Sequence, residues 1–182
     1  MTASSWTAAP LKRMLAAVRD RVLQHYRPDS CIATTKAIIE IVRPADAYAL
    51  HVKALVMNGP FVDLLGSGAD PESPEGIAAG TESGAWAVHV GAGDPEPGKW
   101  AGHLVAIVER KWLVDASIDQ ASRPEHDIHL TEPVVAKVTE AFLRGKEPLL
   151  VVVKKAFIRY DAVPGDKSYR ASPNWQQLRR RE

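Results

Sequence analysis

Apolar residues recur along this chain with two different periods, and these periods divide it into expected helices and strands. Apolar residues at helical spacing predict four helices, over residues 10–26, 31–42 and 132–144 and from Pro173 to near the C-terminus. The helix over residues 31–42 is apolar on most of its sides, so we expect it to be buried in the centre of the fold. Asp29 and Ser30 precede it, and both are residue types that cap helices well.

Strands are predicted where apolar and polar residues alternate or where short apolar runs occur. These segments cover residues 47–57, 85–90, 104–108, 112–116 and 149–163, the last being long enough for a bent strand or a second hairpin. Residues 66–84 contain five glycines and little apolar content, which predicts a long flexible loop, either disordered or placed over a cleft. The whole pattern predicts one α+β domain over residues 1–165, followed by a C-terminal tail or short helix over residues 166–182.

The composition is that of an ordinary globular protein, with 46% hydrophobic and 25% charged residues. The 23 basic and 22 acidic residues nearly cancel to a net charge of +1, so we expect neither a nucleic acid nor a membrane as partner. A single cysteine cannot form an internal disulfide, and no apolar run is long enough to span a bilayer. A cytoplasmic protein is therefore expected.

Three residues with catalytic chemistry follow one another along the chain. Cys31, the only cysteine, lies in the first turn of the helix expected to be buried, where the positive end of the helix dipole favours a thiolate. The strands expected over residues 104–108 and 112–116 would form a hairpin. His103 begins its first strand, and Asp115 lies within the apolar run of its second. These residue types can act as nucleophile, base and orienting group in covalent catalysis. A cysteine that only packs in the core is the competing interpretation.

The turn between the two strands decides whether His103 and Asp115 can meet. A two-residue turn places Asp115 opposite Ala106, on the face away from His103. A three-residue loop over residues 109–111 places Asp115 opposite Val105, on the same face as His103, with Cβ atoms roughly 5–8 Å apart. The catalytic hypothesis therefore requires the three-residue loop or a bulge, although no glycine is present to adopt the positive φ that such loops favour.

A metal site is the other chemistry that the histidines suggest. His126 and His129 form an H-x-x-H pair beside Asp127. A ligand pair of this kind needs a rigid element and a third ligand, and the polar segment that carries it shows neither. We therefore predict no metal site and no cofactor.

The order of these features resembles the transglutaminase-like and papain-like cysteine enzyme superfamily. The similarity is carried by Asp29-Ser30-Cys31 at the start of a helix, by Gly102-His103 at the start of a strand, and by Trp112-Leu113-Val114-Asp115 in the next strand. It covers residues 31–56 and 102–116, about a quarter of the chain. The resemblance implies a papain/transglutaminase-like α+β fold, in which a buried N-terminal helix carrying the cysteine packs on an antiparallel β-sheet.

The resemblance also implies the role of each site residue. Cys31 would be the nucleophile, His103 the base, and Asp115 the group that orients the imidazole. The Cys31 backbone N–H would be the first donor to an oxyanion, while the second donor is not assigned.

This chain departs from the pattern at two positions beside the cysteine. Papain-like enzymes have a glutamine six residues before the cysteine, where this chain has His25, with Gln24 next to it. Ile32 follows the cysteine, where many relatives carry an aromatic residue. Gln24 and Trp100 are the residues that we expect to bind the substrate.

The expected function is that of a thiol-dependent hydrolase or acyltransferase, resembling a cysteine peptidase or amidase. Its partner would be a peptide, a protein or a small substrate with an amide or thioester bond, and hydrolysis is not distinguished from acyl transfer. Two alternatives stay open. One is a non-catalytic peptide- or protein-binding module of the same fold with an idle cysteine. The other is an unrelated α+β binding domain in which Cys31 and His103 lie far apart.

Overall fold

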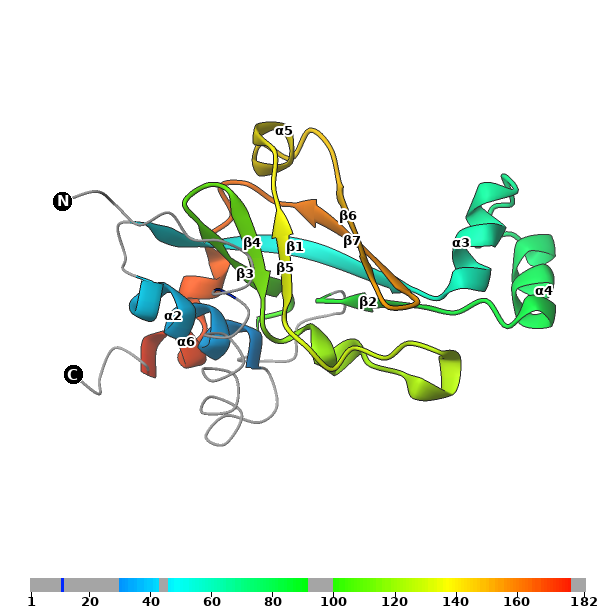
Figure 1. Ribbon diagram of the computed structural model, residues 1–182, viewed down its shortest axis with the longest axis horizontal. Coiled ribbons are helices and arrows are strands. Elements are labelled where there is room, and N and C mark those ends of the chain that lie inside the picture. The colour runs from blue at the N-terminus through cyan, green and yellow to red at the C-terminus, as the bar shows by residue number, and fades with distance from the viewer. Residues whose placement is uncertain (1–10, 12–29, 43–45, 92–99, 178–182) are drawn as a thin grey trace.

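The chain folds into helices and one antiparallel β-sheet that is nearly barrel-shaped, as the α+β prediction requires (Figure 1). The computed structural model describes residues 11, 30–42, 46–91 and 100–177. The strands are β1 (Ala47–Met57), β2 (Ala87–Val90), β3 (His103–Val108), β4 (Trp112–Asp115), β5 (Val134–Lys137), β6 (Leu149–Val153) and β7 (Ala156–Ala162). They are ordered β5-β4-β3-β1-β7-β6, and β2 also pairs with β1.

The helices of the described residues lie beside this sheet or beyond its ends (Figure 1). They are α2 (Ser30–Val42), α3 (Gly59–Gly66), α4 (Pro74–Ser83), α5 (Glu140–Leu143) and α6 (Pro173–Gln177), with 3-10 turns η1 (Ile118–Ala121), η2 (Pro124–His126) and η3 (Ser168–Ala171). Within the described ranges, no helix combines the length and apolarity that a membrane span requires. The helix expected over residues 10–26 lies outside the described residues, apart from Leu11, which is buried.

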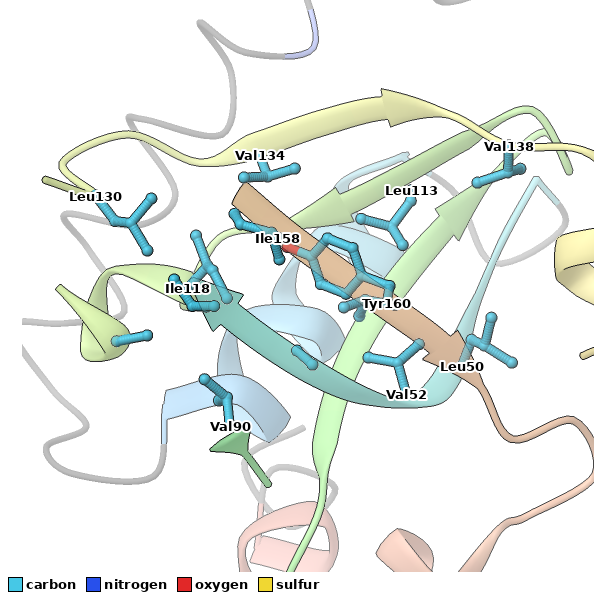
Figure 2. Packing of buried hydrophobic residues seen from close by; sticks show 14 of the residues in the cluster. Leu50, Val52, Val90, Leu113, Ile118, Leu130, Val134, Val138, Ile158 and Tyr160 are labelled. Atoms are coloured by element: carbon cyan, nitrogen blue, oxygen red, sulfur yellow. The ribbon is translucent and has the colours of Figure 1, made fainter. Parts of the chain in front are cut away.

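β1 is the strand on which the sheet is assembled. Along one edge it pairs with β3 through residues 47–52 and with β2 through residues 54–57, and along the other edge it pairs with β7. Its alternate apolar residues are buried on one face, where they form the main hydrophobic core together with side chains of β3, β4 and β7 (Figure 2). The strand and its alternation are thus confirmed as predicted, because successive side chains of a strand point to opposite faces.

α2 covers the other face of the sheet and is largely buried, as its apolar composition predicts, although Ile41 near its C-terminal end is 50% exposed. Its packing partners on β3 and β4 form a second cluster: Ala33, Ile38 and Val42 of α2 with Ala106, Val108 and Val114 of the sheet. The Thr35 hydroxyl donates a hydrogen bond of 2.9 Å to the carbonyl oxygen of Leu104. This bond fastens the N-terminal half of α2 to the beginning of β3.

The prediction of a helix over residues 132–144 is wrong. The segment contains the strand β5 and, after it, the single-turn helix α5, whose N-cap is Thr139. β5 pairs antiparallel with β4, and Val134 lies opposite Asp115. Local periodicity suggested a helix, but Val134 and Val135 are β-branched and the edge of β4 offers backbone partners, so the long-range pairing prevails.

The long loop predicted over residues 66–84 is also wrong, because most of it is the helix α4. Asn58 and Ser73 cap α3 and α4 with side-chain hydrogen bonds to backbone N–H groups, and each helix has a proline in its first turn. Ser73-Pro74 was a start signal that the glycine content concealed. In Figure 1 the α3–α4 pair lies at the opposite end of the long axis from α2, so it does not cover the site around Cys31.

The C-terminal part completes the sheet and then returns to α2. β6 and β7 form a hairpin, the second of the two possibilities expected for residues 149–163. Residues 168–177 form η3 and α6, and α6 begins at Pro173 as predicted. Tyr169 of η3 packs edge-on against Trp175 of α6, and Tyr169 belongs to the buried cluster that contains Cys31. The C-terminal segment therefore forms one wall beside the cysteine.

Candidate active site

The β3–β4 hairpin has the three-residue loop that the catalytic hypothesis requires. Ala106 lies opposite Val114 and Val108 opposite Trp112, so residues 109–111 form the loop. Glu109 and Arg110 adopt positive φ angles of 52° and 53° although neither is a glycine. The loop accepts this left-handed backbone, which costs non-glycine residues conformational energy, and the resulting register places His103 and Asp115 on one face.

His103 and Asp115 form a fully buried pair. The Nε2 atom of His103 lies 2.6 Å from Oδ2 of Asp115, and both side chains have an exposed fraction of 0%. Such a short contact between an imidazole and a carboxylate orients the ring and holds a proton on Nε2. The pair that the sequence could only place on neighbouring strands is therefore in direct contact.

Asp115 is held by three further hydrogen bonds. The Tyr160 hydroxyl on β7 donates to Oδ2 over 3.0 Å, and the Ser117 backbone N–H and hydroxyl donate to Oδ1 over 3.1 and 3.3 Å. Neither Tyr160 nor Ser117 was expected from the sequence. Ser117 had a local signal, because an aspartate commonly accepts a bond from the backbone two residues on. Tyr160 had none, since only the closure of the sheet brings β7 to β4.

Cys31 reaches the same histidine from the other layer of the fold. It lies in the first turn of α2, is buried, and packs in a cluster with Ile32, Leu104 and Tyr169. The Cys31 side chain is among the groups that raise the pKa of His103, so the sulfur lies close to the imidazole. Because Asp115 occupies Nε2, Nδ1 is the nitrogen left for the thiol. Cys31 and His103 therefore do not lie far apart, as the alternative of an unrelated binding domain had assumed.

The charges around His103 favour its protonated form. Burial by itself lowers the pKa of His103, but the charge and hydrogen bond of Asp115, together with the Cys31 side chain, outweigh burial and raise this pKa to about 10. The same carboxylate acts on Tyr160, since burial and the charge of Asp115 raise the pKa of that phenol well above its usual value. At neutral pH the ring is thus an imidazolium between a carboxylate and a sulfur.

The glycine before His103 is required by close packing. A Cβ atom on Gly102 would lie 2.3 Å from the Trp100 ring, and one on Gly91 would lie 2.3 Å from the backbone of Gly102 and His103. Gly91 also has a φ of 74°, which residues with a side chain rarely adopt. The start of β3 is thus packed between Trp100 and the end of β2, which fixes the backbone that carries His103.

Comparison with family models, with curated proteins and with solved structures finds no match for this chain. What the site can do chemically is therefore inferred from its own geometry. A cysteine sulfur, an imidazole ring and a carboxylate that follow one another in space can hold a sulfur nucleophile and a proton within reach of one another. A cysteine that only packed would need neither the charged ring nor the carboxylate beside it.

The two expected substrate-binding residues have different outcomes. Trp100 lies beside the cysteine cluster, where its ring packs edge-on against His51 and Tyr169 and its indole N–H donates to the Ser168 hydroxyl over 2.8 Å. Whether it touches a substrate stays a prediction. Gln24 lies outside the described residues.

Gln120 is a site residue that sequence analysis missed. It belongs to η1, directly after β4, and its Nε2 atom lies 3.3 Å from Nδ1 of His103. Its backbone N–H donates to the Ser117 carbonyl and its own carbonyl accepts from Arg123. Its short sequence distance from Asp115 was the available signal.

The histidines of the H-x-x-H pair have other contacts. His126 stacks on Trp86 with ring centroids 4.6 Å apart, and His129 lies 3.5 Å from an Asp127 carboxylate oxygen on the surface. Over the residues that the structure describes, no three His, Cys, Asp or Glu side chains gather in a way that could hold a metal ion.

Proposed function

We propose that this chain is a thiol-dependent hydrolase or acyltransferase that attacks an amide or thioester bond through Cys31, His103 and Asp115. The observation that carries the proposal is the direct chain of contacts from sulfur to imidazole to buried carboxylate. We also propose that the α+β fold is of the papain/transglutaminase-like type. The support for this is a buried helix that carries the cysteine in its first turn and packs on the antiparallel sheet that carries the other two residues.

The first half of the reaction follows from where the protons lie. With Nε2 held by Asp115, the proton of the Cys31 thiol resides on Nδ1 of His103, so that the ring is an imidazolium and the sulfur is a thiolate before the substrate arrives. The sulfur attacks the carbonyl carbon, an S–C bond forms, and the carbonyl π electrons move to oxygen. The Cys31 backbone N–H, which has no acceptor within its own helix, donates to this oxyanion.

The second half restores the thiol site. The oxyanion collapses, the bond to the leaving group breaks, and His103 gives its proton to the departing nitrogen or sulfur. Water or an amine then loses a proton to His103 as it attacks the acyl-enzyme, and the thiolate is the leaving group. Water yields hydrolysis and an amine yields acyl transfer, and the same three residues serve both.

Labelling with thiol-directed probes tests the proposal. Cys31→Ala should lose all labelling by iodoacetamide and by an acyl probe. His103→Ala should label about 10²-fold more slowly or worse at mildly acidic pH, because the thiol has lost the group that accepts its proton. His89→Ala is the matched control, since that histidine is exposed on β2 and should label at the wild-type rate.

Two outcomes would contradict the proposal. One is that His103→Ala labels as fast as the wild type, and the other is that wild-type Cys31 reacts no faster than a free cysteine peptide. Either would favour a non-catalytic binding module with an idle cysteine.

A further inference from the structure

Gln120 is a solvent-exposed residue that contacts the buried His103 ring. The His103 ring is fully buried, whereas Gln120 is exposed, and its amide approaches the ring at Nδ1. Hydrogen bonds on both sides hold its backbone, to the Ser117 carbonyl at 3.3 Å and from Arg123 at 3.0 Å. The amide is thus carried by a short rigid turn beside the nitrogen that faces the sulfur.

The protonation state of His103 decides what this amide can bond to. A neutral ring would offer a lone pair at Nδ1, and the Gln120 NH₂ group could donate to it. Once the thiol proton is on the ring, Nδ1 is itself a donor, so the amide NH₂ has no acceptor there. Its two N–H groups are then available to the next acceptor that enters the space beside Cys31.

That acceptor is the oxygen of the bond under attack. The substrate carbonyl carbon must lie next to the sulfur, and the sulfur lies next to Nδ1, so the carbonyl oxygen enters the same small region as the Gln120 amide. An oxyanion hole needs preorganised donors aimed at the charge that develops in the transition state. The backbone N–H of Cys31 is one such donor, so a second donor is needed.

We propose that Gln120 is the second oxyanion donor and forms, with the Cys31 backbone N–H, the oxyanion hole of this site. This role rests on the proposed function of Cys31, His103 and Asp115. As the S–C bond forms and the carbonyl electron pair moves to oxygen, Nε2–H of Gln120 donates to that oxygen. When the electron pair returns to carbon and the leaving group departs, the hydrogen bond weakens again. The amide itself gains and loses no proton.

Two probes separate stabilisation of an oxyanion from activation of the thiol. 4-Nitrophenyl acetate acylates the cysteine through a tetrahedral oxyanion and releases 4-nitrophenolate. Iodoacetamide alkylates the same sulfur by displacing iodide, with no oxyanion. We expect Gln120→Ala to lower the acylation rate by about 10²-fold or more and to change the alkylation rate by less than about threefold. Because Gln120 is exposed, its removal leaves the core intact, and a thermal melt verifies this.

Gln120→Glu is the matched variant, because a carboxylate has nearly the same shape and can accept a hydrogen bond but cannot donate one. We expect it to lose acylation as Gln120→Ala does. If Gln120→Glu acylates at the wild-type rate while Gln120→Ala does not, the side chain acts as an acceptor that positions His103, and the proposal is overturned. Wild-type acylation in both variants would overturn it too.

The failure of the proposed function is recognised separately. If the wild type, compared with Cys31→Ala, shows no acylation by 4-nitrophenyl acetate, the covalent mechanism itself is wrong and the role of Gln120 falls with it. If the wild type is acylated and Gln120→Ala equals it, only the role of Gln120 is wrong.

Discussion

At the residue scale, Asp115 organises the site. A carboxylate with no exposed surface is costly to bury unless its oxygens are hydrogen-bonded and its charge is compensated. Asp115 accepts from His103, from Tyr160 and twice from Ser117, and the ring of His103 supplies the opposite charge. These contacts come from three parts of the chain, so the carboxylate ties the hairpin to β7 as well as to the histidine.

The pH dependence of stability should report this pair. Burial lowers the pKa of His103, but Asp115 and Cys31 raise it to about 10, whereas an unfolded chain has an ordinary histidine pKa of about 6.5. Since the folded pKa is the higher one, the stabilisation from this ring is fully present below about pH 6.5 and is lost as the pH rises to about 10. Asp115→Asn removes the charge that raises the pKa.

We therefore expect Asp115→Asn to make the fall of the unfolding free energy between neutral and alkaline pH shallower than in the wild type. Urea unfolding at several pH values measures the two slopes, and comparison of the two proteins cancels the other groups that titrate there. NMR signals of the His103 ring supply a direct check. Parallel slopes and an unchanged ring titration would show that Asp115 does not hold the proton on His103.

At the element scale, the thiol and the imidazole meet because α2 is fastened to β3. The bond from the Thr35 hydroxyl to the Leu104 carbonyl lies next to His103 in sequence, and Thr35 lies one turn after Cys31. A helix packed only by Ala33, Ile38 and similar apolar side chains could slide along the sheet, since hydrophobic contacts are not directional. The hydrogen bond of the Thr35 hydroxyl requires a defined geometry, so it fixes the position of α2 along β3, which apolar packing leaves free.

Thr35→Val should weaken this connection without changing side-chain shape. We expect it to lower the unfolding free energy by about 1 kcal/mol, and to slow iodoacetamide labelling of Cys31 because the first turn of α2 is no longer held against His103. Thr81→Val is the control, since the Thr81 hydroxyl donates to the Ile77 carbonyl of its own helix, α4, away from the site. Equal labelling of wild type and Thr35→Val would show that apolar packing alone positions the cysteine.

At the scale of the whole molecule, closure of the sheet brings together residues that are distant in the chain. β1 and β3 lie between β7 and β4 in the sheet. Tyr160 of β7 nevertheless reaches Asp115 of β4, because the sheet curves into a near-barrel. The α3–α4 pair, by contrast, projects from the far end of β1 and β2 (Figure 1). α3 has no buried residue, and the buried residues of α4 are two glycines.

Removal of the α3–α4 pair should therefore leave the site intact. Met57 lies opposite Ala87, so residues 59–85 can be replaced by an Asn-Gly turn that joins β1 to β2 as a hairpin. We expect the shortened protein to fold and to label at Cys31 at the wild-type rate, measured with iodoacetamide after a circular dichroism check. A folded but unreactive protein would mean that this pair shapes the site after all.

The sequence by itself determined the features that depend on near neighbours. The period of Leu50, Val52, Ala54 and Val56 specified β1, and the cap and apolar run after Ser30 specified α2 with Cys31 in its first turn. The hairpin pattern placed His103 and Asp115 on adjacent strands. These features follow from local propensity and side-chain alternation, which any stretch of chain carries with it.

Only the tertiary structure decided the rest. It selected the three-residue loop that puts His103 and Asp115 on one face, because the buried pair compensates the left-handed backbone at Glu109 and Arg110. It converted residues 134–137 from an expected helix into a strand through pairing with β4. It also added Tyr160 and Gln120 to the site. Such choices depend on contacts between distant segments, which the local pattern of residues does not contain.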